Sequence, residues 1–214
     1  MAENEEIREK IVHGAFDLFN KYGIRSVTMD DIARHLGMSK KTIYQSFSEK
    51  DEIVLAVTKL HQCMWEDRAN HFAETSENAI QELLKFSLVM RDQLKQLNPG
   101  LMFDLFKYHR EAWQEWTTYK SKVIKQKIID TMKRGVGEGY FRAGLNIDIL
   151  ATFRVEQVEM AFNDSIFPRD KFRFDEVQLQ LFEHFIYGCL THKGIDLFEE
   201  TKRKLFELEP TPTK

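Results

Sequence analysis

The stretch TMDDIARHLGMSKKTIYQSFSEK, residues 28–50, contains two helix starts in close succession. Thr28 is a typical N-cap, because a side-chain oxygen at this position accepts a free backbone amide of the first helical turn. We predict that the first helix runs to about Leu36 and that Gly37 ends it in the left-handed conformation. Ser39 is a second N-cap, so another helix begins within about three residues and must cross the first steeply.

The second of these helices surrounds one apolar residue, Ile43, with hydrogen-bonding and cationic side chains. Such a surface suits the major groove of DNA, where lysines bind phosphates or guanine edges and other polar side chains reach bases. The hydroxyl of Tyr44 can donate to a phosphate. An ordinary surface helical hairpin is the alternative interpretation. The predicted DNA-contacting residues, including neighbours at both ends of the motif, are Arg25, Thr28, Ser39, Lys40, Lys41, Thr42, Tyr44, Gln45 and Lys50.

A longer segment around this motif resembles the DNA-binding domain of TetR-family repressors. The resemblance runs from Ile7 to about Leu55 and rests on AFDLFNKYGIRSVTMDDIARHLGMSKKTIYQSFSEKDEIV, residues 15–54. A second motif, GVGEGYFR at residues 135–142, is similar to a junction between later helices of that family. The resemblance implies a ligand pocket in the second half of the chain and a four-helix dimer interface.

The composition is that of a globular protein with an uneven charge distribution. Hydrophobic residues make up 43% of the 214 residues, and no apolar run approaches the roughly 20 residues that span a bilayer. The acidic start, MAENEEIREK, resembles neither a signal nor a transit peptide, so we expect a cytoplasmic protein. The formal net charge is −3, but residues 21–50 carry +3, which leaves −6 for the rest. A basic end on an acidic body orients the molecule towards DNA.

We expect an all-α fold with an N-terminal helix-turn-helix domain of three helices. The first helix should end near Gly23, after an apolar stripe at three- and four-residue steps. Ser48, with Asp51 three positions on, opens a long connector helix into a helical effector-binding and dimerisation domain. The expected domain boundaries are residues 1–47 and 48–214.

Helical periodicity continues to the end of the chain, and no alternating strand pattern or hairpin turn appears. The Asn-Pro-Gly sequence at residues 98–100 stops one helix, and the glycine-rich segment at residues 135–144 forms a turn between two others. The predicted later helices cover residues 76–97, 101–109, 113–135, 147–166, 174–191 and 195–206.

The sequence contains no constellation that supports catalysis. There is no HExxH motif, and the glycines of GVGEGY lack the preceding strand of a dinucleotide-binding fingerprint. Cys63 and Cys189 have no metal-ligand or redox spacing, so we expect two core thiols rather than a disulfide. We therefore predict a protein that is not an enzyme, with no cofactor and no metal site.

Tryptophan, tyrosine, methionine and histidine are concentrated in the middle of the chain, where they provide apolar walls with polar atoms. This composition suits a small-molecule pocket between helices, although most of these residues are expected to be structural core. The predicted ligand-binding residues are His61, Trp65, Phe86, Met90, Phe103, Phe106 and Trp113.

The last two long helices carry apolar residues on more than one face, so each needs a second surface against which to bury them. A two-fold dimer formed from both helices meets this need. The predicted interface residues are Phe153, Val158, Phe162, Phe182, Phe185 and Gly188, although Gly188 is equally compatible with packing inside one subunit.

These observations together predict a ligand-responsive transcriptional regulator that acts as a repressor. Its expected partners are a palindromic double-stranded DNA operator, a second copy of the chain and an apolar or amphipathic small molecule. Two alternatives remain open: an architectural DNA-binding protein without an effector, and an all-helical enzyme or small-molecule carrier that contains a helical hairpin.

Overall fold

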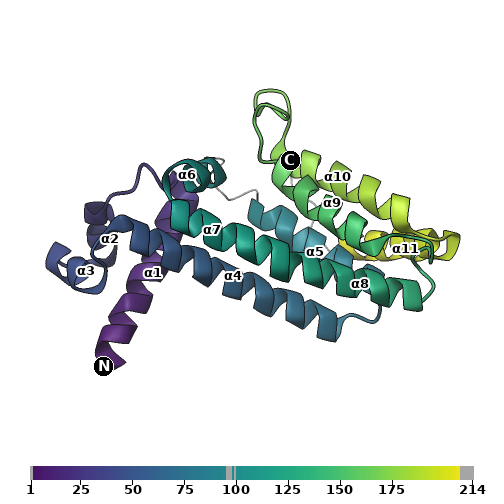
Figure 1. The fold of residues 1–214 in the computed structure, drawn as a ribbon, viewed down its shortest axis with the longest axis horizontal. Helices are drawn as coiled ribbons and strands as arrows, with labels where there is room; N and C mark the ends of the chain where they lie inside the picture. The colour runs from purple at the N-terminus through teal and green to yellow at the C-terminus, as the bar shows by residue number, and fades with distance from the viewer. Residues whose placement is uncertain (1, 95–97, 99, 208–214) are drawn as a thin grey trace. The chain divides into compact units, whose positions relative to one another are not determined.

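The computed structural model describes residues 2–94, 98 and 100–207, and these residues form the expected all-α fold without a β-strand (Figure 1). None of the described helices is long and apolar enough to cross a membrane. The helices are α1 (Ala2–Tyr22), α2 (Met29–Leu36), α3 (Lys40–Ser46), α4 (Lys50–Thr75), α5 (Ala79–Leu94), α6 (Leu101–Tyr108), α7 (Arg110–Tyr119), α8 (Lys125–Gly137), α9 (Ile147–Met160), α10 (Phe174–Cys189) and α11 (His192–Glu207).

The chain forms two compact units that do not coincide with the expected domains. The first unit comprises Met1–Glu66 and Gln96–Lys120, and the second comprises Asp67–Lys95 and Ser121–Lys214. Hence the start of α4 and all of α6 and α7 pack with the helix-turn-helix. The expected division after residue 47 would uncover residues of α4 and α6 that belong to this first core, such as Ile53 and Leu105.

The local signals predicted for the helix-turn-helix are all present. Thr28 Oγ1 accepts the amide of Asp31, whose carboxylate accepts the amide of Thr28 in return, so the two form a capping box at the start of α2. Gly37 ends α2 in the left-handed conformation with φ 63°. Ser39 Oγ accepts the amide of Thr42 at 3.1 Å and caps α3.

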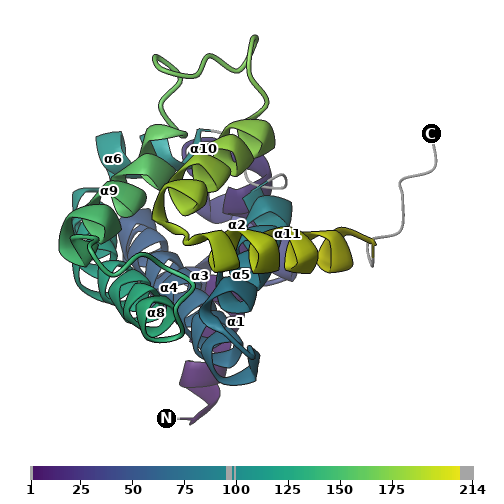
Figure 2. The same ribbon diagram turned by 90° about the vertical axis from the view of Figure 1, so that its right-hand side faces the viewer.

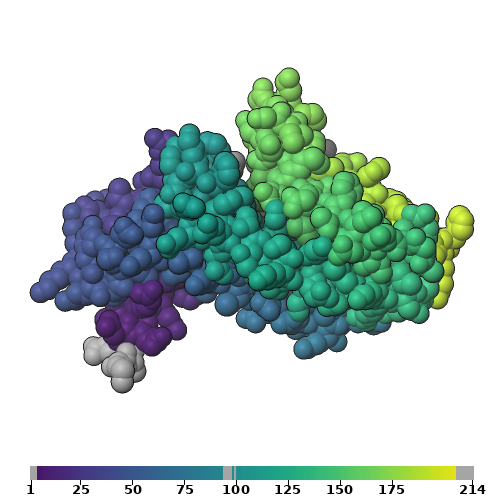
Figure 3. Space-filling view, viewed as in Figure 1, coloured from purple at the N-terminus to yellow at the C-terminus, as the bar shows by residue number. Residues whose placement is uncertain are grey.

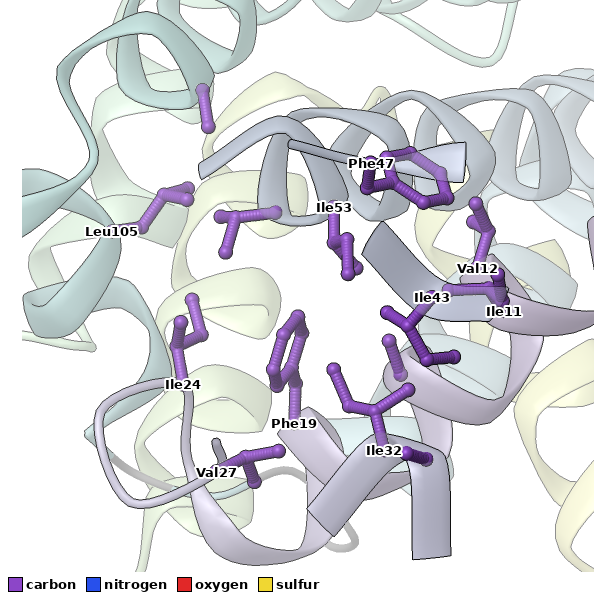
Figure 4. Packing of buried hydrophobic residues seen from close by; sticks show 14 residues of the cluster. Ile11, Val12, Phe19, Ile24, Val27, Ile32, Ile43, Phe47, Ile53 and Leu105 are labelled. Atoms are coloured by element: carbon purple, nitrogen blue, oxygen red, sulfur yellow. The ribbon is translucent and has the colours of Figure 1, made fainter. Parts of the chain in front are cut away.

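The first core lies where α1, α2, α3 and the start of α4 meet (Figure 4). Phe19 of α1, Ile32 of α2 and Ile43 of α3 are at most 1% exposed, so one side chain from each helix fills the centre. Burial of each such side chain contributes about 1.5–3 kcal/mol to the stability of the fold. Because one of these side chains comes from each helix, their packing also sets the angle of α3. Ile32, Ala33, Ile43 and Phe47 are buried at the corner between α2 and α3, and Leu36 and Met38 pack at its edge.

The second unit is a bundle in which α10 and α11 both pack on α5, and α8 packs on α5 and α9 (Figure 2). Its core includes Ile80, Met132, Phe182 and Phe198. Arg134 joins the helices at one end by donating to the carbonyl oxygen of Ser76 at 2.8 Å and pairing with Glu82 and Glu138. Residues 161–173, between α9 and α10, form a loop that projects from this unit (Figure 3).

Three expectations about the later chain are wrong in detail. The predicted single helix at 113–135 is α7, a π-helical segment (Lys120–Ile124) and α8. The helix predicted at 147–166 ends at Met160, because a tight turn follows in which the amide of Asn163 donates to the Met160 carbonyl oxygen. Cys63 is exposed, whereas Cys189 is a buried free thiol whose pKa is raised by burial to about 11.

Candidate functional site

The recognition surface consists of the residues of α3 that point away from the buried side chain of Ile43. Lys41, Tyr44 and Gln45 are exposed, and 52% of the surface of Tyr44 is accessible. Lys40 is also exposed but forms an ion pair with Asp30 of α2. An exposed pair of this kind is worth little in water, so the Lys40 ammonium can exchange it for a phosphate.

Three of the predicted DNA-contacting hydroxyls also stabilise the motif itself. Thr28 Oγ1 donates to Asp31 Oδ2 at 2.6 Å, and the Ser39 and Thr42 hydroxyl oxygens are 2.9 Å apart. Hydrogen bonding to Thr28 lowers the pKa of the Asp31 carboxyl group. These contacts keep α2 and α3 correctly started, so Thr28, Ser39 and Thr42 position the exposed residues of α3.

Arg25 lies in the loop between α1 and α2, where the sequence predicts a phosphate contact. Its backbone amide donates to Asp104 Oδ2 at 3.0 Å, and its guanidinium lies 5.4 Å from the ring centre of Tyr108. Both partners belong to α6. The side chain is exposed, and the loop that carries it is attached to α6 as well as to the helix-turn-helix.

Lys50 does not stand free at the start of α4, contrary to the expectation of a phosphate contact. Its ammonium donates to the carbonyl oxygen of Ile24 and is half-buried beside the Phe19 ring. Burial lowers the pKa of Lys50, against the opposing effect of nearby acidic groups. A lysine held in this way fastens α4 to the loop before α2, which is a structural role.

Arg8 is a residue of this site that sequence reasoning missed. Its Nη1 atom donates to the carbonyl oxygen of Ser46 at 2.7 Å, and its guanidinium lies 3.9 Å from the ring centre of Phe47. A cation at this place complements the negative end of the α3 dipole. The only sequence indication is its position next to Ile7 in the apolar stripe of the first helix.

The seven predicted ligand-binding residues do not form one site within either unit. In the first unit, the indole Nε1 of Trp65 donates to His61 Nε2 at 2.7 Å, and Phe106 packs edge-on against Trp113 at 5.2 Å. Phe103 and Phe106 are 56% and 61% exposed, respectively. The two remaining residues, Phe86 and Met90, belong to α5 of the second unit.

Several buried polar atoms of the described residues have no hydrogen-bond partner. In the first unit these include Gln62 Nε2 and Trp116 Nε1, and in the second Gln178 Oε1. The neighbouring hydroxyl of Tyr119 donates to the Gln62 carbonyl oxygen at 3.2 Å, and burial raises the pKa of Tyr119 to about 12. Buried polar atoms are usually hydrogen-bonded in folded proteins, so these atoms can pair with water or with a bound molecule.

The six predicted interface residues divide into buried and accessible positions. Phe182 and Phe185 are 4% and 6% exposed and lie in the core of the second unit, so they are not available to a partner. Val158 and Phe162 are partly buried, and Phe162 packs on Phe174.

The other two predicted residues are accessible. Phe153 is 48% exposed, and a Cβ atom added to Gly188 would meet no other atom within 4 Å. The expectation about Phe182 and Phe185 fails because periodicity shows that a helix has two apolar faces but not which of them the chain itself covers.

No group of three or more histidine, cysteine, aspartate or glutamate side chains suited to a metal ion is found among the described residues. The exposed surface of α3, on a capped helix-turn-helix, is the candidate DNA-binding site, because a short helix presented in this way is the element that such motifs place in the major groove.

Comparison with known proteins agrees with this assignment. Residues 11–57 match the family described as "Bacterial regulatory proteins, tetR family". The HTH-type transcriptional regulator YvaF of Bacillus subtilis is 32% identical over 106 residues, which are 49% of this chain and 55% of YvaF. The HTH-type transcriptional repressor KstR2 of Mycobacterium tuberculosis is 22% identical over 149 residues, 68% of this chain and 74% of KstR2. This chain thus spans about half the length of the first relative and three quarters of the second.

The fold agrees with solved structures. A TetR-family transcriptional regulator from Cytophaga hutchinsonii superimposes with a TM-score of 0.71 at 16% identity, covering 89% of this chain and 98% of that one. The chain therefore has the fold of these regulators, with an N-terminal helix-turn-helix. Over residues 11–57 it is similar to the TetR family of bacterial regulatory proteins. Its relatives are regulators rather than enzymes, which agrees with the expectation of a protein without catalytic activity.

Proposed function

We propose that this protein is a ligand-responsive repressor that binds a palindromic operator as a homodimer in the cytoplasm. The exposed face of α3 is the observation that carries the proposal. Lys41, Tyr44 and Gln45 project from a helix whose opposite side is fixed by the buried Ile43. A short helix with this division of residues fits a major groove, with Lys41 and Gln45 directed at base edges and Tyr44 at a phosphate.

The outward faces of α9 and α10 support the homodimer. Ile149 and Phe153 are 63% and 48% exposed and lie one turn apart on α9, where they form an apolar surface that water does not favour. On α10 the exposed residues Gln180, His184 and Gly188 recur at four-residue intervals. Gly188 allows close approach of a second backbone, so a two-fold contact between these helices would cover Ile149 and Phe153.

The unpaired buried polar atoms support an effector. A regulator must have a second state that a ligand favours, and the ligand shifts the equilibrium only by its differential affinity for the two states. Gln62 Nε2, Trp116 Nε1 and Gln178 Oε1 are unsatisfied in the state described. A bound molecule that satisfied some of these atoms would favour the state in which they are paired. By linkage, operator DNA must weaken the binding of such an effector by the same factor.

Selection from a random pool of duplex DNA tests the proposal directly. The purified protein should enrich a palindrome whose half-sites are about one helical turn apart or a multiple of it, as two symmetry-related α3 helices require. The Lys41→Ala variant should enrich a relaxed version at one position of each half-site. Enrichment of no sequence, or of a single half-site without symmetry, would contradict the proposed operator-binding dimer.

A further inference from the structure

Arg154 of α9 is a partly buried, positively charged side chain of the second unit without a carboxylate partner. Its Nη1 atom lies 3.3 Å from the amide oxygen of Gln157, and its guanidinium lies 5.3 Å from the ring centre of Phe182 and 5.9 Å from that of Phe185. Among the described residues, no aspartate or glutamate lies within ion-pair distance of it. Burial lowers the pKa of Arg154 to about 10, which leaves the guanidinium charged at neutral pH.

A buried charge that is not neutralised by the chain is costly, and such charges are normally paired. The rings of Phe182 and Phe185 offer only their π-faces, which compensate part of the lost hydration. The guanidinium carries five donors, and a single amide oxygen from Gln157 satisfies few of them. The guanidinium of Arg154 therefore has donors left over that an anionic group could accept.

The guanidinium lines a small hollow between α9, α10 and α5. The hollow has a volume of about 10 Å³, room for one water molecule, and its wall is formed by Ser87, Met90, Arg91, Arg154, Gln178 and Leu179. Gln178 contributes the unpaired Oε1 atom, while its Nε2 donates to the carbonyl oxygen of Val158 at 2.9 Å. Arg154, Ser87 and Gln178 thus line this space together with Arg91, which forms an ion pair with Asp92, and no acidic residue forms part of its wall.

A second hollow continues from the first along α5 and α10. The two share Ser87 and Leu179, and the second is otherwise bounded mainly by apolar side chains, among them Leu84, Leu88 and Phe198. Lys202 and Glu183 also line the second hollow and form an ion pair with each other. The two hollows together are therefore lined by the Arg154 guanidinium, by apolar side chains and by a neutralised pair.

We propose that the second unit binds an amphipathic monocarboxylate, with its carboxylate on Arg154 and its hydrocarbon chain between α5 and α10. Arginine binds a carboxylate through two parallel hydrogen bonds, and Ser87 can donate a third. This inference rests on the proposed function, because it names the chemical class of the effector. It concerns binding to the second unit alone and does not require operator release.

The hollows must widen to admit such a chain. Met90, Leu88 and Leu179 line them with long, flexible side chains, and methionine in particular adapts its shape at little cost. If only a small fraction of the molecules is in the open arrangement, the measured affinity of a ligand that needs this arrangement falls in proportion to that fraction. This reduction is the same for every ligand that needs the open arrangement. The chemical class of the ligand is therefore best identified by comparing the affinities of several compounds for the same protein.

Calorimetric titration of the full-length protein with octanoate, 1-octanol and acetate tests the inference. Octanoate should bind at least about 10-fold more tightly than 1-octanol, because only octanoate can pair with Arg154. It should also bind more tightly than acetate, which has no chain to bury. Arg154→Met should bind octanoate and 1-octanol equally, whereas Arg154→Lys should retain part of the preference for octanoate.

The exposed Lys133 of α8 provides a control, since Lys133→Met removes one positive charge from the same unit and should leave the preference unchanged. Circular dichroism checks that each variant keeps its helix content. Equal affinities of the wild type for octanoate and 1-octanol, binding of neither, or an unchanged preference in Arg154→Met would overturn the inference. Octanoate that binds through Arg154 but leaves operator affinity unaltered would sustain the binding site and contradict the proposed regulatory function.

Discussion

The ammonium nitrogen of Lys50 donates a hydrogen bond to the backbone carbonyl oxygen of Ile24 at 2.5 Å. Lys50 is the first residue of α4, and Ile24 lies in the loop that precedes α2, so this contact joins two ends of the helix-turn-helix domain. The same nitrogen lies 5.9 Å from the ring centre of Phe19 in the core. Lys50 therefore holds the loop and α4 together, and its ammonium group is engaged in this bond.

The first prediction is that Lys50→Met weakens the fold rather than a phosphate contact. Loss of a hydrogen bond from a charged donor should lower the free energy of unfolding by about 1–2 kcal/mol, since the site is only half-buried. Urea denaturation measures this loss. The salt dependence of operator binding should keep the wild-type slope, because no phosphate contact is removed. Lys59→Met, at an exposed position of α4, is the matched control. A flatter salt dependence of operator binding, with unchanged stability, would instead show that Lys50 contacts a phosphate.

The second prediction concerns the recognition surface on α3. Lys41→Ala should cost about 1–3 kcal/mol of operator affinity and relax specificity at one base position, as expected for a lysine that contacts a base edge. Tyr44→Phe should cost about 0.5–1.5 kcal/mol by removing one hydrogen bond. Fluorescence anisotropy with the selected operator measures both. Neither variant should lose helix content, because both side chains are exposed. Wild-type affinity in both would refute the assignment of α3 as the recognition helix.

The third prediction separates interface residues from core residues in the second unit. Phe153→Glu places a charge on the proposed dimer surface and should yield a folded monomer with much weaker operator binding. Phe182→Glu places a charge in the core and should unfold the unit. Sedimentation velocity and circular dichroism distinguish the two results. Arg203→Glu, on an exposed part of α11, should change neither. A dimeric Phe153→Glu protein would exclude this face as the interface.

The fourth prediction is a loss of stability in mild acid that depends on His61. Burial lowers the pKa of His61 to about 4, and its Nε2 atom accepts the indole hydrogen of Trp65, which requires the neutral imidazole. The unfolded chain, with a histidine pKa near 6.5, takes up the proton first as the pH falls. Stability should therefore decrease between about pH 6.5 and pH 4, by roughly 3 kcal/mol in total.

Urea denaturation at several pH values measures this effect. His61→Gln should remove most of the dependence in that pH range, because glutamine does not titrate. His35→Gln, at an exposed position of α2, should leave it unchanged. If His61→Gln and the wild type lose stability in parallel, other groups are responsible.

The fifth prediction compares two glycines of the second unit. A Cβ on Gly194 of α11 would lie 2.2 Å from the backbone oxygen of Tyr140 and 3.0 Å from Leu190 Cδ2, so Gly194→Ala should displace α11 and lower the melting temperature. A Cβ on Gly137, at the end of α8, would meet no atom within 4 Å. Gly137→Ala should be neutral or stabilise by up to about 1 kcal/mol, since alanine favours a helix. Equal effects in thermal denaturation would contradict the close approach of α11 to Tyr140.

The sequence by itself determined the helix-turn-helix, because the forces that set its boundaries act over a few residues. The caps of Thr28 and Ser39 and the left-handed Gly37 each involve the nearest turn of chain, so their residue types predict their conformations. The same holds for the exposed face of α3, which follows once Ile43 is assigned to the core. The all-α class followed from periodicity in the same way.

Only the tertiary structure decided which charged and apolar side chains are available for function. Lys50 and Ile24 are 26 residues apart, and Arg154 meets Phe182 and Gln178 only after α9 and α10 have packed together. Helical periodicity assigns a residue to a face but not to the neighbour of that face, so it could not tell that Phe182 is internal while Phe153 is exposed. Contacts between distant segments depend on the packing of whole helices, which no local pattern encodes.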